Sequence, residues 1–234
     1  MPWPRCGPPC SPGPTEAVRP RRLVLVVGTG TDVGKTWVSA RLLATLRAAG
    51  VTVAARKPAQ SFDPGDDPGG LDSAVLGVAS GEPSEGVCPP GRWYEVAMAP
   101  PMAADALGRG RFTLAELVQE LAWAPGPVDV GLVETAGGVR SPQTHDADCV
   151  AVAEALAPDI VLLVADAGLG TLNSVRLSVG ALPGSAPVVV VLNRYDAGDD
   201  LHVANRRWLT GHYGLSVVEM PGGEEALAAL VHPN

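Results

Sequence analysis

The sequence predicts an α/β protein with a mostly parallel sheet flanked by helices on both faces. Three observations support this prediction. Short apolar runs of strand length recur along the chain, bounded by glycine or polar residues. Segments with helical periodicity alternate with these runs, as in successive βαβ units. Hydrophobic residues make up 46% of the 234 residues, which is enough for one core in one domain.

The first strand and helix are the clearest elements. Residues 23–27 form a continuous apolar run that ends at Gly28, as expected of a strand buried on both faces. Residues 35–49 carry apolar side chains at helical spacing, and Gly50 is well placed to end this helix. A second strand follows at 51–56.

The same alternation continues to the C-terminus. Residues 63–70 and 80–91 are rich in turn-forming residues and are predicted loops. Thr113 and Glu116 have the spacing of a capping box at a helix start. Helices are predicted at 71–79, 113–123, 147–156, 173–182 and about 201–213, and strands at 128–133, 160–165, 188–192 and 216–219.

The N-terminus differs in composition from the rest of the chain. Residues 1–22 contain seven prolines among glycine, serine and arginine, a composition that cannot form a packed core. We therefore predict a disordered extension at 1–22 and a single domain at 23–234.

Composition argues against several classes of protein. The net charge of −8 is the wrong sign for a nucleic-acid-binding protein. No apolar run reaches the roughly 18 residues needed to span a membrane, and no secretory signal is recognisable. The four cysteines show no metal-binding spacing, which favours free thiols. These features predict a cytoplasmic protein.

A glycine-rich loop directly follows the first predicted strand and opens into the first helix, which is the context of a P-loop. Its sequence is Gly28-Thr29-Gly30-Thr31-Asp32-Val33-Gly34-Lys35-Thr36. Backbone N–H groups of such a loop bind phosphate oxygens, a lysine neutralises the β- and γ-phosphates, and a threonine hydroxyl can ligate Mg²⁺. Because five residues instead of four separate the outer glycines, the loop is a variant form. It predicts binding of ATP and Mg²⁺.

Two carboxylates are candidates to complete the metal site with Thr36. Glu134 ends a predicted strand, where ligands bind in open α/β sheets, and the following Ala136-Gly137-Gly138 allows close backbone approach. Asp72 is the second candidate, with a helix N-terminal aspartate in an acidic loop as its alternative interpretation.

Lysine usage points to the same region. The chain has 17 basic residues, but only Lys35 and Lys57 are lysines. A chain that otherwise uses arginine is expected to keep lysine where a compact ammonium group is required.

Five segments together resemble the dethiobiotin synthetase family. They are the loop at 28–36, Arg56-Lys57-Pro58, Leu71-Asp72, Glu134-Thr135-Ala136-Gly137-Gly138 and Gly168-Leu169-Gly170-Thr171-Leu172-Asn173. The resemblance spans residues 23–193. It implies a seven-stranded parallel sheet and a homodimer with the active site near its interface. It also implies a ligase that uses ATP, Mg²⁺, CO₂ and the diamine 7,8-diaminopelargonate.

In the implied reaction, one amine captures CO₂ as a carbamate. The carbamate oxygen attacks the γ-phosphate of ATP, and the second amine then displaces phosphate and closes a cyclic urea. Lys35 would hold the γ-phosphate, and Lys57 would lie beside the carbamate and phosphoryl oxygens. Thr31 and Ser61 would lie near the diamine. Asn193 would face the adenine.

The resemblance also implies the binding sets. The substrate carboxylate would bind backbone N–H groups of Thr171, Leu172 and Asn173, with N-capping by Thr171 or Asn173 as the alternative. Mg²⁺ would bind Thr36, Asp72 and Glu134. The nucleotide would bind Gly30, Thr31, Asp32, Val33, Gly34, Lys35, Thr36, Glu134 and Asn193.

Three segments depart from the family pattern. Thr135 replaces a glycine, an exchange expected to narrow the diamine site. Ala99-Pro100-Pro101 replaces a polar Ser-Pro-His segment, and Arg194-Tyr195-Asp196 follows Asn193. The phosphate and metal half of the site is thus expected to be intact, whereas the substrate half has drifted.

Two alternative functions remain open on the sequence. The drift favours a related ligase that applies carbamate-phosphate chemistry to another amine or diamine. The other is a nucleotide-switch ATPase that binds a protein partner, although such proteins usually carry an extra lysine early in the loop. His145, Asp146 and Asp148 resemble a metal cluster, but they lie on a loop that enters an apolar helix, where we expect capping and exposure to solvent. Asp166 is expected either to help position Mg²⁺ or water or to have a structural role.

Overall fold

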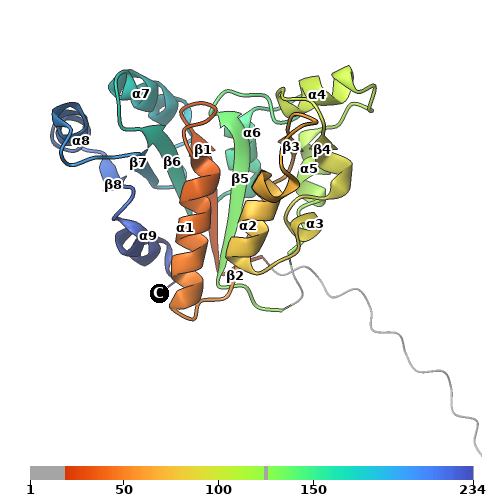
Figure 1. Ribbon diagram of the computed structural model, residues 1–234, viewed down its shortest axis with the longest axis horizontal. Coiled ribbons are helices and arrows are strands. Elements are labelled where there is room, and N and C mark those ends of the chain that lie inside the picture. Colours follow the sequence, from red (N-terminus) through yellow and green to blue (C-terminus); the bar gives the residue numbers. More distant parts are fainter. Residues whose placement is uncertain (1–18, 124–125, 234) are drawn as a thin grey trace, which may run out of the picture.

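The computed structural model describes residues 19–123 and 126–233. Its centre is a parallel sheet with the predicted α/β architecture (Figure 1). The strands are β1 (Arg22–Gly28), β2 (Val53–Arg56), β5 (Val130–Gly138), β6 (Ile160–Asp166), β7 (Val188–Asn193) and β8 (Ser216–Glu219). They lie in the order β2-β5-β1-β6-β7-β8, and each neighbouring pair is parallel.

The central sheet has six strands within the described residues, not the seven that the resemblance implied. Two further strands of two residues each, β3 (Gln60–Ser61) and β4 (Trp93–Tyr94), do not extend this sheet. They hydrogen-bond to one another and form a separate parallel ribbon beside it.

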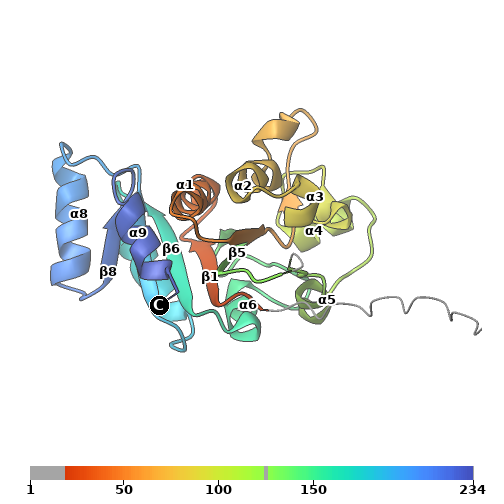
Figure 2. The ribbon, with the colours of Figure 1, turned by 90° about the horizontal axis from the view of Figure 1, so that it is seen from below.

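Helices cover both faces of the sheet, as predicted (Figure 2). They are α1 (Lys35–Ala48), α2 (Asp72–Ser80), α3 (Ser84–Val87), α4 (Pro100–Ala106), α5 (Leu114–Gln119), α6 (Cys149–Leu156), α7 (Thr171–Ala181), α8 (Asp200–Gly211) and α9 (Glu224–Val231). One apolar cluster joins the sheet to α1, α2 and α9, and a second joins it to α6, α7 and α8.

The central position of β1 in the sheet explains why its sequence is uniformly apolar. Val24 and Val26 belong to the cluster on one face, whereas Leu23, Leu25 and Val27 belong to the cluster on the other. Successive side chains of a strand point to opposite faces, so a strand covered on both sides must be apolar throughout.

Several predicted element boundaries are corrected. β5 extends to Gly138, so Glu134 lies inside the strand and not at its end. α5 ends at Gln119, four residues before the predicted end, although the capping box of Thr113 and Glu116 is confirmed. α4 and α9 were not predicted, and α3 lies in a segment predicted as a loop. α4 was missed because it begins with two prolines, which usually indicate a break in a helix. Proline is nevertheless tolerated at the first helical position.

The ordered chain also begins before residue 23. The Arg21 backbone N–H donates to the Val128 carbonyl at 2.9 Å, and the Arg19 guanidinium donates to the carbonyl of Ala157 at 2.7 Å. The remainder of the predicted extension, residues 1–18, lies outside the described residues. No helix in the described part of the chain is long and apolar enough to cross a membrane.

Candidate active site

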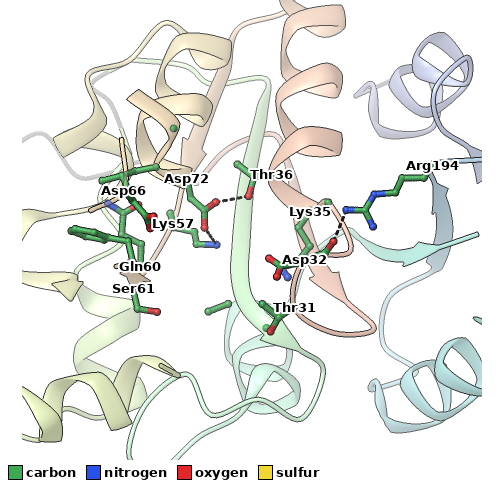
Figure 3. A pocket seen from close by; sticks show the side chains of 16 residues that line it. Thr31, Asp32, Lys35, Thr36, Lys57, Gln60, Ser61, Asp66, Asp72 and Arg194 are labelled. Atoms are coloured by element: carbon green, nitrogen blue, oxygen red, sulfur yellow. Dashed lines mark hydrogen bonds and ion pairs between the residues drawn. The ribbon is translucent and has the colours of Figure 1, made fainter. Parts of the chain in front are cut away.

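A cavity of about 550 Å³ lies beside the phosphate loop, between that loop and the start of α2 (Figure 3). Arg194 stands at one side of it, Gln60, Ser61 and Asp66 at the other, and the two lysines between them. Many of the predicted site residues line this cavity: Thr31, Asp32, Gly34, Lys35, Thr36, Lys57, Ser61 and Asp72.

The phosphate loop takes a sharply turned course before α1. Gly34 has a φ of 88°, and a Cβ at this position would collide with the Asn193 side chain. Glycine is therefore required here both by conformation and by space. The loop ends where α1 begins, at Lys35, whose Nζ lies 3.1 Å from the Gly30 carbonyl oxygen.

The three predicted metal ligands come together from three different elements. Thr36 Oγ1 lies 2.6 Å from Asp72 Oδ1 and 2.8 Å from Glu134 Oε1. Thr36 belongs to α1, Asp72 to α2 and Glu134 to β5. All three supply oxygen, the donor atom that Mg²⁺ prefers. In the described residues no group of three or more His, Cys, Asp or Glu side chains is arranged to hold a metal, so a cation here depends on the hydroxyl as well.

Lys57 joins the two carboxylates. Its Nζ lies 2.6 Å from Asp72 Oδ2 and 2.9 Å from Glu134 Oε1. The Glu134 side chain is 0% exposed, and the Ser39 hydroxyl donates to its second oxygen at 2.7 Å. Buried charges are tolerated only when they are paired and hydrogen-bonded. Both oxygens of Glu134 meet this requirement.

The pKa values of the two lysines are shifted in opposite directions. Burial lowers the pKa of Lys35, and the nearby charge of Lys57 lowers it further. Burial alone would also lower the pKa of Lys57, but Asp72 and Glu134 raise it above its ordinary value. Burial would raise the pKa of Asp72, but Lys57 lowers it below the ordinary range. Lys57 and Asp72 therefore remain an ion pair at neutral pH.

Two residues of this network were not predicted. Gln60 accepts from the Ser73 backbone N–H and donates to the Ser73 hydroxyl, both at 3.0 Å, and so fixes the start of α2 that carries Asp72. Ser39 lies one turn after Thr36 on α1, and this helical spacing could have indicated that both face Glu134. The sequence offers no comparable signal for Gln60.

The predicted carboxylate-binding residues lie apart from this cavity. Thr171 and Leu172 do not line it, and Asn173 lines an adjoining cavity that also includes Thr31. α7 begins at Thr171 after Gly170, and no side chain caps it, so the N-capping interpretation is wrong. Thr171 Oγ1 is buried and has no hydrogen-bond partner among the described residues.

Val33, within the phosphate loop, and Asn193, at the end of β7, do not line the cavity. The Asn193 side chain is buried and donates through Nδ2 to the Val33 carbonyl at 2.9 Å. It thus supports the loop from the end of β7. Its contact with adenine stays a prediction.

Of the three departures from the family pattern, Arg194 lines the cavity, whereas Thr135 and the segment 99–101 do not. Thr135 does not narrow it, because its side chain is buried and its hydroxyl donates to the Val26 carbonyl at 3.2 Å. Neighbouring Ala136 and Gly137 line the cavity instead. The segment 99–101 does not line the cavity either, but the carbonyl of the preceding Met98 accepts from Ser61 at 2.5 Å.

The remaining polar candidates have structural roles. Asp146 accepts from the Leu114 backbone N–H at the start of α5, and Asp148 caps α6 through two backbone N–H groups. His145 Nε2 lies 3.1 Å from Asp105. Asp166 pairs with Arg194 at 2.8 Å, which supports a structural role, and its part in positioning Mg²⁺ or water stays a prediction.

Comparison with known proteins identifies the family of this chain. Residues 22–220 match the AAA_26 family model, described as an AAA domain. The ATP-dependent dethiobiotin synthetase of Haloferax mediterranei is 38% identical over 199 residues, 84% of this chain and 82% of its own. Its counterpart in Anaeromyxobacter sp. (strain Fw109-5) is 34% identical over 213 residues, 90% of each chain.

Among solved structures, the signal recognition particle receptor FtsY from Elizabethkingia anophelis is 16% identical with a TM-score of 0.49. It covers 86% of this chain and 58% of its own. The curated relatives, in contrast, match over most of both chains at more than 30% identity. This chain therefore belongs to the ATP-dependent dethiobiotin synthetase family.

Proposed function

We propose that this chain is an ATP- and Mg²⁺-dependent ligase of biotin biosynthesis that converts 7,8-diaminopelargonate and CO₂ to dethiobiotin. The observation that supports it best is the arrangement of Lys57 between Asp72 and Glu134, facing the same cavity as Lys35. Phosphoryl transfer needs positioned positive charge more than covalent catalysis. A carbamate, which carries negative charge, has the same requirement.

Thr36, Asp72 and Glu134 would hold Mg²⁺, because one oxygen of each carboxylate lies within 2.8 Å of Thr36 Oγ1. The bound cation would neutralise phosphate charge. The two carboxylates raise the pKa of Lys57, so its ammonium group would supply a positive charge beside the phosphate. Lys35, which follows the phosphate loop directly, would contact the γ-phosphate.

The proposed reaction balances in three steps. One substrate amine attacks CO₂ and loses a proton, which gives a carbamate. A carbamate oxygen attacks the γ-phosphorus of ATP and ADP leaves, which gives a carbamoyl phosphate anhydride. The second amine attacks the carbamoyl carbon and loses a proton, phosphate leaves with the bridging oxygen, and the cyclic urea closes. Thr31 and Ser61 line the part of the cavity that would hold the amines.

We also propose that the protein is a homodimer. Thr171–Asn173 lie outside the main cavity, so one chain alone does not bring the carboxylate site to the lysines. α7 and the loop before it expose large apolar side chains, with Leu169 93% and Leu177 68% exposed. A second copy packed on α7 would cover them. Light scattering should give a dimer for the wild type and a monomer for Leu177→Arg.

The test of the proposed function is ADP release by the full chain with Mg·ATP and bicarbonate, with and without 7,8-diaminopelargonate. We expect diamine-dependent ADP release with dethiobiotin detected by mass spectrometry, and loss of both in Lys35→Ala. ATP binding without diamine-dependent turnover would contradict the substrate assignment. It would favour the related ligase that acts on another amine.

A further inference from the structure

The end of β7 contacts two successive carbonyl groups of the phosphate loop. Asn193 Nδ2 donates to the Val33 carbonyl at 2.9 Å, and Arg194 Nη2 donates to the Asp32 carbonyl at 2.7 Å. The second Arg194 nitrogen, Nη1, lies 2.8 Å from Asp166 at the end of β6. Two neighbouring strand ends therefore fix one stretch of the loop.

These contacts determine where the loop's backbone N–H groups point. In a trans peptide unit the carbonyl and the following N–H point in opposite directions. Because the carbonyls of Asp32 and Val33 point to β7, the N–H groups of Val33 and Gly34 point away from β7. Gly34 lines the cavity at the start of α1, and backbone N–H groups at a helix N-terminus bind anions.

The backbone of the phosphate loop and of its β7 partner takes an uncommon conformation at the point where the two meet. Asp32 and Arg194 both have a φ of 57°, in the left-handed region that non-glycine residues rarely adopt. Such conformations persist where neighbouring contacts over-determine them, often at functional sites. Here each left-handed residue is one end of the same hydrogen bond between Arg194 and Asp32.

We propose that Asn193 and Arg194 form a clamp that presets the phosphate loop for the triphosphate of ATP. Both are positioning residues, and the inference rests on the proposed function. Without the clamp the loop samples other conformations, and apparent affinity falls by the fraction of molecules that are competent to bind. Arg194 also lines the cavity, so a direct contact between its guanidinium and phosphate is the competing explanation.

The variant Asp166→Asn distinguishes the clamp from a direct contact between Arg194 and phosphate. If Arg194 acts through the Asp32 carbonyl, Asp166→Asn releases one end of the guanidinium and weakens nucleotide binding. If Arg194 instead contacts phosphate directly, removing its neutralising partner leaves binding unchanged or makes it tighter, because the positive charge is then less compensated.

The experiment is calorimetric titration of the full chain with Mg·ATP and with Mg·tripolyphosphate. We expect about tenfold weaker binding of both ligands by Arg194→Met, and a smaller loss for Arg194→Lys and Asp166→Asn. Arg206→Met is the matched control, because it removes another partly exposed arginine–carboxylate pair, with Glu219, away from the cavity. The control should bind both ligands like the wild type.

Hydrogen exchange of the ligand-free protein gives a second measurement. Amides of residues 28–34 should exchange faster in Arg194→Met than in the wild type, while exchange in β1 and α1 stays unchanged. Unaltered binding by Arg194→Met would overturn the clamp, as would a loss confined to ATP, which would indicate a contact with the base. If the wild type binds neither ligand, the proposed function fails together with the clamp. If the wild type binds and the variants bind equally well, only the clamp fails.

Discussion

The two halves of the site are built differently. The proposed phosphate and metal half is a closed ring of contacts, in which Lys57 and Thr36 each lie within hydrogen-bonding distance of both Asp72 and Glu134. The substrate half is spread over Ser61, the adjoining cavity and the start of α7. The residues proposed for phosphoryl transfer are thus joined within one chain, whereas the residues proposed to bind the diamine line separate parts of it.

The largest expected effect follows from removing Lys57, which links the two carboxylates of the phosphate and metal half. Lys57→Met leaves the fully buried Glu134 without its cation, which should cost about 3–5 kcal/mol of unfolding free energy. For a domain of this size the melting temperature should fall by about 10 °C. Turnover should fall by about 100- to 1000-fold, because a positioned positive charge is lost.

The double variant Lys57→Met/Glu134→Gln separates stability from catalysis. Removing the buried carboxylate charge as well should restore part of the melting temperature but none of the turnover. Calorimetry and ADP release measure the two effects. A double variant that loses as much stability as both single variants combined would show that the pair is not coupled.

The next prediction sharpens the difference between the two lysines. Because the chain has only two lysines, ¹³Cε-lysine labelling should give two resonances, which Lys57→Met would assign. Lys35 should titrate below its ordinary value of 10.5, because burial and Lys57 lower its pKa. Lys57 should keep its proton above pH 10.5. A shared midpoint would contradict the network.

The same shifts set the pH range of stability. The Lys57 pKa is raised on folding, so its contribution is complete below about pH 10.5 and lost only as pH rises beyond it. The Asp72 pKa is lowered, so its contribution is present above about pH 3.8 and lost as pH falls further. Thermal melts across pH should show the ion pair intact between these limits.

A smaller effect tests the substrate half at Thr135. Thr135→Gly restores the residue type typical of the family, but the side chain points away from the cavity. The KM for the diamine should therefore stay within about twofold. The free energy of unfolding should fall by about 1–2 kcal/mol, because a buried hydrogen bond to Val26 is lost and glycine is unfavourable in a strand. A large gain in diamine affinity would show that Thr135 does narrow the site.

The smallest expected effect is at Thr171. Its hydroxyl is buried without a hydrogen-bond partner among the described residues, so Thr171→Val should leave the free energy of unfolding unchanged or raise it by about 1 kcal/mol. Denaturant unfolding measures this. A clear loss of stability would mean that the hydroxyl has a partner in the assembled protein, such as a second copy of the chain.

Local patterns carried much of the fold and part of the site. The apolar run of β1, the glycine loop and the helix after it could be predicted because each depends on neighbouring residues alone. The meeting of Lys57, Asp72 and Glu134 depends on β5 lying between β2 and β1, which composition and periodicity do not specify. The sequence alone named Asp72 and Glu134 as metal candidates, but only the family resemblance gave Lys57 a role beside the phosphoryl oxygens.

Three other features could not be predicted from the sequence, each for a physical reason. The orientation of Thr135 follows from strand alternation once β5 is known to continue past Glu134, but the sequence suggested that the strand ended there. Arg194 reaches a carbonyl 162 residues away, and no local signal marks such a contact. α9 is a short helix of eight residues, and its brief periodicity did not reveal it.

The central position of β1 has a consequence for synthesis on the ribosome. Val26 in β1 meets Thr135 in β5, which lies 109 residues later. At roughly 5–20 residues per second, β1 waits roughly 5–20 s for its first neighbouring strand to be made. During that interval the apolar segment 23–27 has neither β5 nor β6 to pair with, so the nascent chain exposes a segment prone to aggregation.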